Sequence, residues 1–121
     1  MKAFLQGKPP KIYGDGEQTR DFTFISDVVQ ANFAAATSPK APGNIYNIAG
    51  GNKISINELA QKISKLTGSD QKPEYADARK GDIKHSYASI ELAKTDLNWE
   101  PRVDLSSGLE KTFQWYSKNG F

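Results

Sequence analysis

The sequence predicts a mixed α/β protein that represents part of a larger α/β fold. Two apolar stretches, residues 21–25 and 44–49, have the composition of strands, and each precedes a segment with helical periodicity. The whole pattern gives about four helices and three or four short strands. These are too few for a complete parallel sheet, which needs cover on both faces and neighbours at its edges. We therefore expect the chain to be part of a larger structure.

The first third of the chain reads as turns and strands followed by a helix. Residues 7–20 are rich in glycine and proline, as loops are, and residues 11–13 within them favour a short strand. Ser26 is a suitable N-cap and Asp27 suits the positive end of a helix dipole, which predicts a helix over 27–37. Its buried face is expected to carry the residues that share helical spacing, namely Val28, Val29, Asn32, Phe33 and Ala36.

The clearest local signal lies in the middle of the chain. Ser55 and Glu58 form an S-x-x-E capping box, and the apolar residues behind them recur at helical spacing. Gly68 is a suitable stop for this helix. Residues 73–76 favour a short strand, and residues 77–88 read as irregular.

Two helices complete the expected order. A short helix follows Ser89 and extends to about Leu97, and Asp104 or Ser106 caps a final helix. The expected order is therefore turn, strand, helix, strand, helix, strand, loop, helix and helix.

The composition excludes several kinds of site. The 121 residues include no cysteine and a single histidine, His85, which excludes disulfides, zinc–thiolate centres, cysteine nucleophiles and histidine-rich metal sites. A lone histidine without a nucleophile is expected to be an ordinary surface or core residue. The net charge of +2 is too balanced to indicate nucleic acid, and no apolar run reaches the ~20 residues of a membrane span. Without an apolar leader, a cytoplasmic protein is expected.

Arginine is scarce and unevenly placed. Only three of the sixteen basic residues are arginines, namely Arg20, Arg79 and Arg102. Arginine offers a rigid fork that binds phosphate or carboxylate at two points, whereas lysine is mostly a solvated surface charge. Two of the three arginines adjoin glycine-containing turns, Gly14-Asp15-Gly16 and Arg79-Lys80-Gly81-Asp82.

Two interpretations of these turns stay open on the residues alone. In the simpler one, Arg20 pairs with Asp21 or Asp27, and Arg79 and Asp82 form a weak local ion pair on the surface. In the other, an arginine holds a phosphate and Asp82 accepts a hydrogen bond from a ribose hydroxyl.

Four motifs, taken in order, resemble one known family. They are residues 12–28, residues 46–51, Arg79-x-Gly81-Asp82, and residues 97–101 followed by Gly108-Leu109 and Trp115-Tyr116. Together they resemble the C-terminal, substrate-binding portion of the extended short-chain dehydrogenase/reductases. The resemblance is greatest to the UDP-glucose 4-epimerase branch of the NAD-dependent nucleotide-sugar epimerases and dehydratases. It covers nearly the whole chain, so residues 1–121 are expected to form one nucleotide-sugar-binding domain that lacks the main Rossmann sheet.

The resemblance implies a UDP-sugar site and a role for each of its residues. Arg20 and Arg79 would grip the diphosphate, Asp82 would face the uridine ribose, and Tyr13 would stack on or flank the uracil. Ser86 would line the sugar pocket, where a small residue admits N-acetylated sugars and a bulky one excludes them. Arg102 matches no binding position and is expected to be structural. No catalytic, cofactor-binding or metal-binding residue is expected in this chain.

The resemblance also implies what the complete enzyme contains. In the family, NAD takes hydride from sugar C4 and returns it to the other face of a 4-keto intermediate. The glycine-rich NAD loop and the Tyr-x-x-x-Lys pair do not occur in this sequence, so no turnover is expected from the chain alone. Its partners are expected to be a UDP-sugar and either identical copies or a separate NAD-binding chain, with no nucleic acid and no membrane. The alternative is a non-catalytic module for nucleotide-sugar binding or assembly.

Overall fold

A computed structural model describes residues 1–120, which form two compact units with separate cores. Unit 1 contains Met1–Arg20, Ile54–Ser86 and the described residues from Ser106 onward. Unit 2 contains Asp21–Lys53 and Tyr87–Leu105. Each unit is therefore assembled from segments that are distant in the sequence.

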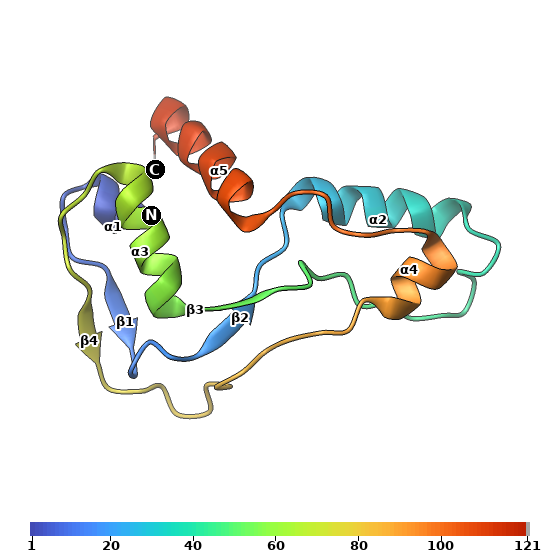
Figure 1. The fold of residues 1–121 in the computed structure, drawn as a ribbon, viewed down its shortest axis with the longest axis horizontal. Coiled ribbons are helices and arrows are strands. Elements are labelled where there is room, and N and C mark those ends of the chain that lie inside the picture. The colour runs from blue at the N-terminus through green and yellow to red at the C-terminus, as the bar shows by residue number, and fades with distance from the viewer. Residues whose placement is uncertain (121) are drawn as a thin grey trace. The chain divides into compact units, whose positions relative to one another are not determined.

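Unit 1 is built around a short parallel strand pair. β1 (Lys11–Tyr13) pairs with β4 (Glu74–Ala76), so that Ile12 lies opposite Tyr75 and Tyr13 lies opposite Ala76 (Figure 1). The Gly14 N–H donates to the Ala76 carbonyl at 2.8 Å, which extends the pairing one residue beyond β1. Because the strands are parallel, the segments that follow them leave from the same edge.

Helices supply the core of unit 1. They are α1 (Lys2–Leu5), α3 (Ile56–Thr67) and α5 (Leu105–Asn119). The buried side chains are apolar residues of α1, β1 and α3, namely Phe4, Ile12, Ala60 and Ile63. Leu109 of α5 packs against this cluster, which ties the last helix to the rest of the unit.

The boundaries of α3 confirm the sequence prediction. The Ser55 hydroxyl accepts from the Glu58 N–H at 3.1 Å, and the Glu58 carboxylate accepts from the Ser55 N–H at 2.9 Å. The helix ends at Gly68, which adopts the left-handed conformation with φ 65°. Both signals are local, so they act independently of the remaining fold.

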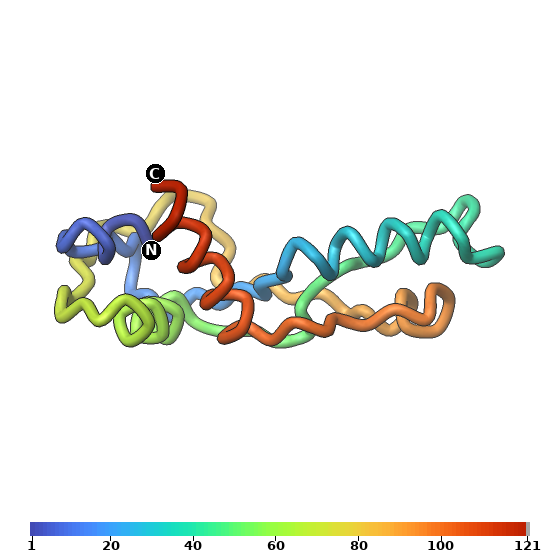
Figure 2. Tube along the Cα trace, turned by 90° about the horizontal axis from the view of Figure 1, so that it is seen from above, coloured from blue at the N-terminus to red at the C-terminus, as the bar shows by residue number. Residues whose placement is uncertain are grey.

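Unit 2 joins two helices through extended segments. α2 (Ile25–Thr37) and α4 (Glu91–Leu97) enclose a core of alanines and larger apolar residues that includes Ile90, Leu97 and Trp99. The segment after α4 lies alongside α2 (Figure 2), because the Trp99 indole N–H donates to the Asp27 carbonyl at 3.0 Å. The Val103 N–H also donates to the Asp27 carboxylate at 3.1 Å.

Two strand predictions are wrong. β2 (Thr19–Asp21) begins two residues before the predicted strand over 21–25, and it forms a two-stranded sheet with β3 (Lys53–Ser55). Residues 44–49 are extended but join no strand pair in the described part of the chain. A segment with an alternating apolar pattern forms a strand only where a neighbouring strand supplies hydrogen bonds, and the pattern does not identify that strand.

The predicted start and buried face of α2 are also wrong. The helix begins at Ile25 after an extended Phe24, whose carbonyl accepts from the Asp27 N–H at 3.0 Å, so Ser26 is not its cap. Asp27 and Ala31 are the buried residues, whereas Val29 and Phe33 are 46% and 70% exposed. The buried face of the helix is therefore the one on which Asp27 accepts hydrogen bonds from Trp99 and Val103. The larger apolar side chains of the helix are exposed.

The other predicted elements are present, whereas α1 and β3 were not predicted. A strand at 11–13, a strand near 73–76, the irregular segment 77–88, a short helix ending at Leu97 and a final helix after Asp104 are all confirmed. Within residues 1–120, no helix has both the length and the apolar character needed to cross a bilayer.

We expect Ser55→Ala to destabilise unit 1 by about 1 kcal/mol, because it removes the cap of α3. Hydrogen bonds from Ser55 lower the pKa of the Glu58 carboxyl. A lowered folded-state pKa stabilises the protein above the ordinary value of 4.5, and this contribution is lost as pH falls through the lower folded value. Denaturant unfolding at neutral and acidic pH measures both effects.

The matched control is Ser106→Ala, which makes the same change at an exposed helical position. Its free energy of unfolding should change little at any pH. Equal losses in the two variants would contradict the capping account, and a Ser55→Ala loss that persists unchanged in acid would show that the Glu58 carboxylate does not contribute to it.

Candidate functional site

The structure places all five predicted binding residues in unit 1. Tyr13 ends β1 and Arg20 lies in β2, while Arg79, Asp82 and Ser86 lie in the irregular segment after β4. The parallel pairing of β1 with β4 starts both connecting segments from one edge, so residues more than sixty positions apart come together.

The turn after β1 is fixed by glycine geometry. Gly14 and Gly16 have φ of 80° and 76°, in the left-handed region that favours glycine. A Cβ at Gly16 would overlap the Asn57 side chain. Asn57, in the first turn of α3, also donates from its backbone to the Gly16 carbonyl at 3.0 Å and from its amide to the Asp15 carbonyl at 3.0 Å. The start of α3 therefore holds this turn in place.

Arg20 and Asp82 form an ion pair. One Arg20 nitrogen, Nη2, lies 2.6 Å from Asp82 Oδ1, and Nη1 donates to the Thr19 carbonyl at 2.8 Å. Their side chains are 27% and 39% exposed, so solvent still reaches the pair. The arginine and the aspartate of the two sequence motifs thus meet each other directly.

This pair corrects the simpler interpretation of both turns. Arg20 does not pair with Asp21, which accepts from the Gly51 N–H at 3.1 Å, nor with Asp27, which accepts from Val103. Asp82 does not form a side-chain pair with Arg79, although its N–H donates to the Arg79 carbonyl at 3.1 Å within the turn. Spacing alone favours partners near in sequence, and the fold supplies one that is 62 positions away.

Ser86 is held beside Arg20 through Thr19. The Thr19 N–H donates to the Lys84 carbonyl at 2.8 Å, and the Ser86 N–H donates to the Thr19 carbonyl at 3.1 Å. The Ser86 side chain is exposed. The Thr19 hydroxyl and His85 Nδ1 lie 3.0 Å apart, which places His85 at this edge as well. No local signal predicts Thr19 or His85 here, because their contact depends on long-range pairing.

Arg79 lies over the Tyr13 ring. Its guanidinium carbon is 3.9 Å from the ring centroid, and the Lys11 ammonium is 5.6 Å from the same centroid. A hydrogen bond from Arg79 and the positive charges of Lys11 and Arg79 lower the pKa of the Tyr13 hydroxyl from its ordinary value of 10.0. Tyr13 and Arg79 therefore form one cationic, aromatic group at the end of the strand pair.

A hollow of about 290 Å³ opens between the two turns. Three of the predicted residues line it, namely Tyr13, Arg79 and Asp82. Lys84 also lines it and lies 4.0 Å from the Asp15 carboxylate. Among residues 1–120, no carboxylate forms an ion pair with Arg79, so its charge is available to an anion without breaking a bridge.

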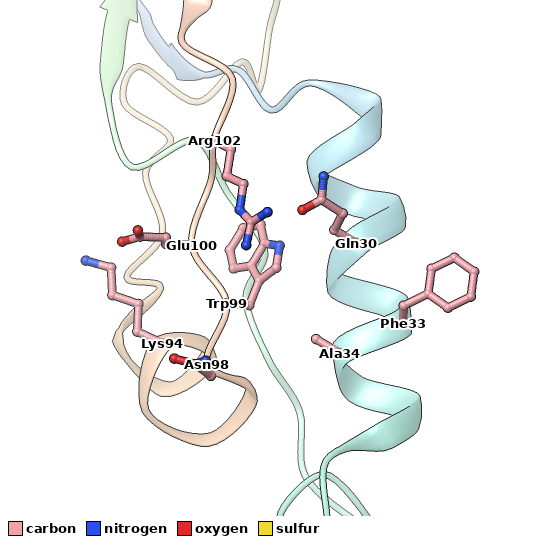
Figure 3. A pocket seen from close by; sticks show the side chains of 8 residues that line it. All are labelled: Gln30, Phe33, Ala34, Lys94, Asn98, Trp99, Glu100 and Arg102. Atoms are coloured by element: carbon pink, nitrogen blue, oxygen red, sulfur yellow. The ribbon is translucent and has the colours of Figure 1, made fainter.

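Two other hollows contain none of the predicted binding residues. A more polar one in unit 1, of about 650 Å³, is bordered by Tyr75 and His85. One in unit 2, of about 440 Å³, lies between α2 and the segment after α4 (Figure 3). Arg102 and Trp99 line it, whereas the Phe33 ring points away from the other side chains. Arg102, expected to be structural, thus lies far from the Arg20 and Arg79 motifs along the chain and in a different unit.

The described residues do not form a dinucleotide or metal site. A dinucleotide cradle needs glycines between a strand and the N-terminus of a helix. Gly14 and Gly16 instead lie between two strands, and Gly50 and Gly51 precede a third. Within residues 1–120, no three histidine, cysteine or carboxylate side chains are grouped to hold a metal ion. Among residues 1–120, these features assign no residue to NAD or to a metal.

Comparison with solved structures confirms the expected fold class. The chain matches a UDP-glucose 4-epimerase from Thermotoga maritima, solved with UDP-glucose, with a TM-score of 0.92 and 36% identity. The match covers 97% of this chain and 37% of that one. The mixed α/β architecture is that of the C-terminal portion of the extended short-chain dehydrogenase/reductase enzymes, as the motifs predict.

The family follows from a second comparison. A family model described as GDP-mannose 4,6 dehydratase matches residues 1–112, and the chain therefore belongs to this family. This result confirms the resemblance to NAD-dependent nucleotide-sugar epimerases and dehydratases.

Individual relatives act on UDP-sugars according to their names. A UDP-glucuronate 4-epimerase of Thermodesulfobacterium geofontis is 41% identical over 98% of this chain. A UDP-glucuronic acid 4-epimerase of Bacillus cereus, solved with UDP-glucuronic acid and NAD, matches 97% of this chain with a TM-score of 0.91 and 35% identity. The chain spans 36% and 38% of the length of these two relatives, respectively.

Proposed function

We propose that this chain is the nucleotide-sugar-binding portion of an NAD-dependent UDP-sugar 4-epimerase. The observation that carries the proposal is the hollow at the end of the β1–β4 pair, where Arg79 faces an opening without a carboxylate partner. Arg20 lies beside it through its bridge to Asp82. Two arginines from separate segments, β2 and the loop after β4, suit a diphosphate, which offers oxygens to both forks.

The remaining residues supply orientation in this proposal. Asp82 would face the ribose of the uridine, since this residue lines the hollow. Ser86 would border the sugar, since Thr19 holds it next to Arg20. Binding energy from the nucleotide would thus fix the sugar for a reaction carried out by groups outside this chain.

NAD would belong to the complete enzyme rather than to this chain. The glycines here do not fit a dinucleotide, whereas a structural relative was solved with NAD. The proposal therefore assigns no chemical step to these residues. A non-catalytic module that binds a nucleotide sugar or serves in assembly is the second candidate, because the same hollow would serve it equally well. The single-domain organisation over residues 1–121 and the cytoplasmic location stay predictions.

We expect Arg79→Met to weaken UDP binding to the 121-residue chain by about tenfold or more, because a hydrogen-bonded charge is lost. Calorimetry or ligand-observed NMR measures the affinity. Arg102→Met is the matched control, since it removes the same charge in unit 2 and should leave UDP affinity unchanged. Equal effects of the two substitutions would show that Arg79 is not part of the UDP-binding site.

Ser86 gives a prediction about the sugar. An exposed serine leaves room at this edge, so UDP-N-acetylglucosamine should bind about as well as UDP-glucose. Ser86→Tyr should weaken binding of the N-acetylated nucleotide selectively, because the larger ring fills that space. Ser117→Tyr, at an exposed position on α5, is the control. An unchanged ratio of the two affinities in Ser86→Tyr would show that this residue does not border the sugar.

The outward face of α2 gives a prediction about assembly. Ile25, Val29 and Phe33 are spaced four residues apart and are 65%, 46% and 70% exposed. We propose that a second copy covers this stripe when the chain is alone, and that the NAD-binding part covers it in the complete enzyme. Light scattering at micromolar concentration should show a dimer or a larger oligomer.

Substitutions on α2 test the surface directly. Val29→Lys with Phe33→Lys should shift the chain to a monomer. Leu92→Lys, which alters a residue of α4 that is 51% exposed, should not. A monomer before any substitution would contradict the proposed association.

A further inference from the structure

We propose that Tyr13 is a positioning residue for Arg79, and that its ring holds the guanidinium toward the hollow where a diphosphate would bind. The proposal rests on the nucleotide-binding function and deepens it. It assigns the ring to the arginine rather than to the uracil, with which the family resemblance had associated it.

The contact itself is close and specific. The Arg79 guanidinium carbon lies 3.9 Å from the Tyr13 ring centroid, well within the ~6 Å over which a cation is attracted to an aromatic face. The guanidinium therefore occupies the position that a stacked base would need on that face. A base could use the same face only by displacing the arginine.

The strand register explains why the two residues meet. Tyr13 is the last residue of β1 and lies opposite Ala76, the last residue of β4. Gly14 then bonds back to the Ala76 carbonyl at 2.8 Å, which keeps the two departing segments together. Arg79 follows three residues after Ala76, so its long side chain can reach back to the end of β1, where Tyr13 lies.

The ring gives Arg79 a support that leaves its charge free. Two other cations at this edge are held by carboxylates, Arg20 by Asp82 at 2.6 Å and Lys84 by Asp15 at 4.0 Å. A phosphate that approached either of them would compete with an anion already in place. An aromatic face restricts the flexible arginine without neutralising it, which suits a group that must meet an anionic ligand.

The titration of Tyr13 is consistent with this arrangement. The pKa of its hydroxyl is lowered, first by the hydrogen bond from Arg79 and then by the charges of Lys11 and Arg79. These causes agree with the short distance between the Arg79 guanidinium and the Tyr13 ring.

A double-mutant cycle with two ligands separates positioning from base stacking. Tyr13→Leu, Arg79→Met and the double variant of the 121-residue chain are titrated with uridine and with UDP. Positioning predicts that Tyr13→Leu weakens UDP binding about two- to fivefold, the range of an exposed cation–aromatic contact, and leaves uridine binding unchanged. The loss should vanish in the Arg79→Met background, and Tyr13→Phe should retain most of the affinity.

An exposed tyrosine outside this site supplies a matched control. Tyr87 lies in unit 2, is 61% exposed, and does not line the hollow of Tyr13 and Arg79. Tyr87→Leu should therefore leave the affinities for both ligands unchanged. Equal losses of uridine and UDP binding in Tyr13→Leu, persisting without Arg79, would overturn the proposal and assign the ring to the uracil.

A second measurement needs no nucleotide. The side-chain NMR signals of Arg79 should be shifted upfield by the ring, and Tyr13→Leu should return them to ordinary arginine values while Tyr13→Phe does not. Unchanged Arg79 signals in Tyr13→Leu would overturn the proposal even if UDP binds. Shifted signals in a chain that binds no uridine nucleotide would refute the proposed function but retain the Tyr13–Arg79 contact.

Discussion

The parallel pairing of β1 with β4 is the constraint on which the candidate site depends. Three residue pairs fix the register, and the Gly14 hydrogen bond continues it into the turn. Since parallel strands end at the same edge, the turn after Tyr13 and the loop after Ala76 must leave together. The contacts of Arg79 with Tyr13 and of Arg20 with Asp82 both follow from that shared starting point. Neither contact could form if the register slipped, because a shift of one residue reverses the side that each side chain faces.

The accuracy of the sequence predictions depended on how local each signal is. The Ser55 cap and the Gly68 stop involve residues within one turn of helix, and both are confirmed. The segment 44–49 and the exposed face of α2 depend on partners elsewhere, so apolar pattern alone assigned them wrongly. The sequence also singled out Arg20, Arg79 and Asp82 through scarcity and turn chemistry, although it could not predict which of them would pair. The roles of all five binding residues stay predictions.

Two of the cations at the site are already paired with carboxylates. Arg20 and Lys84 each have a carboxylate neighbour, whereas Arg79 contacts an aromatic ring. An incoming diphosphate would therefore meet Arg79 first and would compete with Asp82 for Arg20. Exposed ion pairs contribute little to stability, so exchanging Asp82 for phosphate would cost little. This arrangement suits a site in which an anionic ligand replaces Asp82 as the partner of Arg20.

Chemical-shift mapping on the isotope-labelled chain shows where UDP binds, because it reports on both units at once. We expect UDP to perturb backbone amides of residues 13–20 and 77–86 in unit 1. The amide chemical shifts of the residues that line the hollow of Trp99 and Arg102 in unit 2 should remain unchanged. Perturbations centred on that second hollow, or none at any site with UDP in large excess, would contradict the assignment of the nucleotide to the end of the β1–β4 pair.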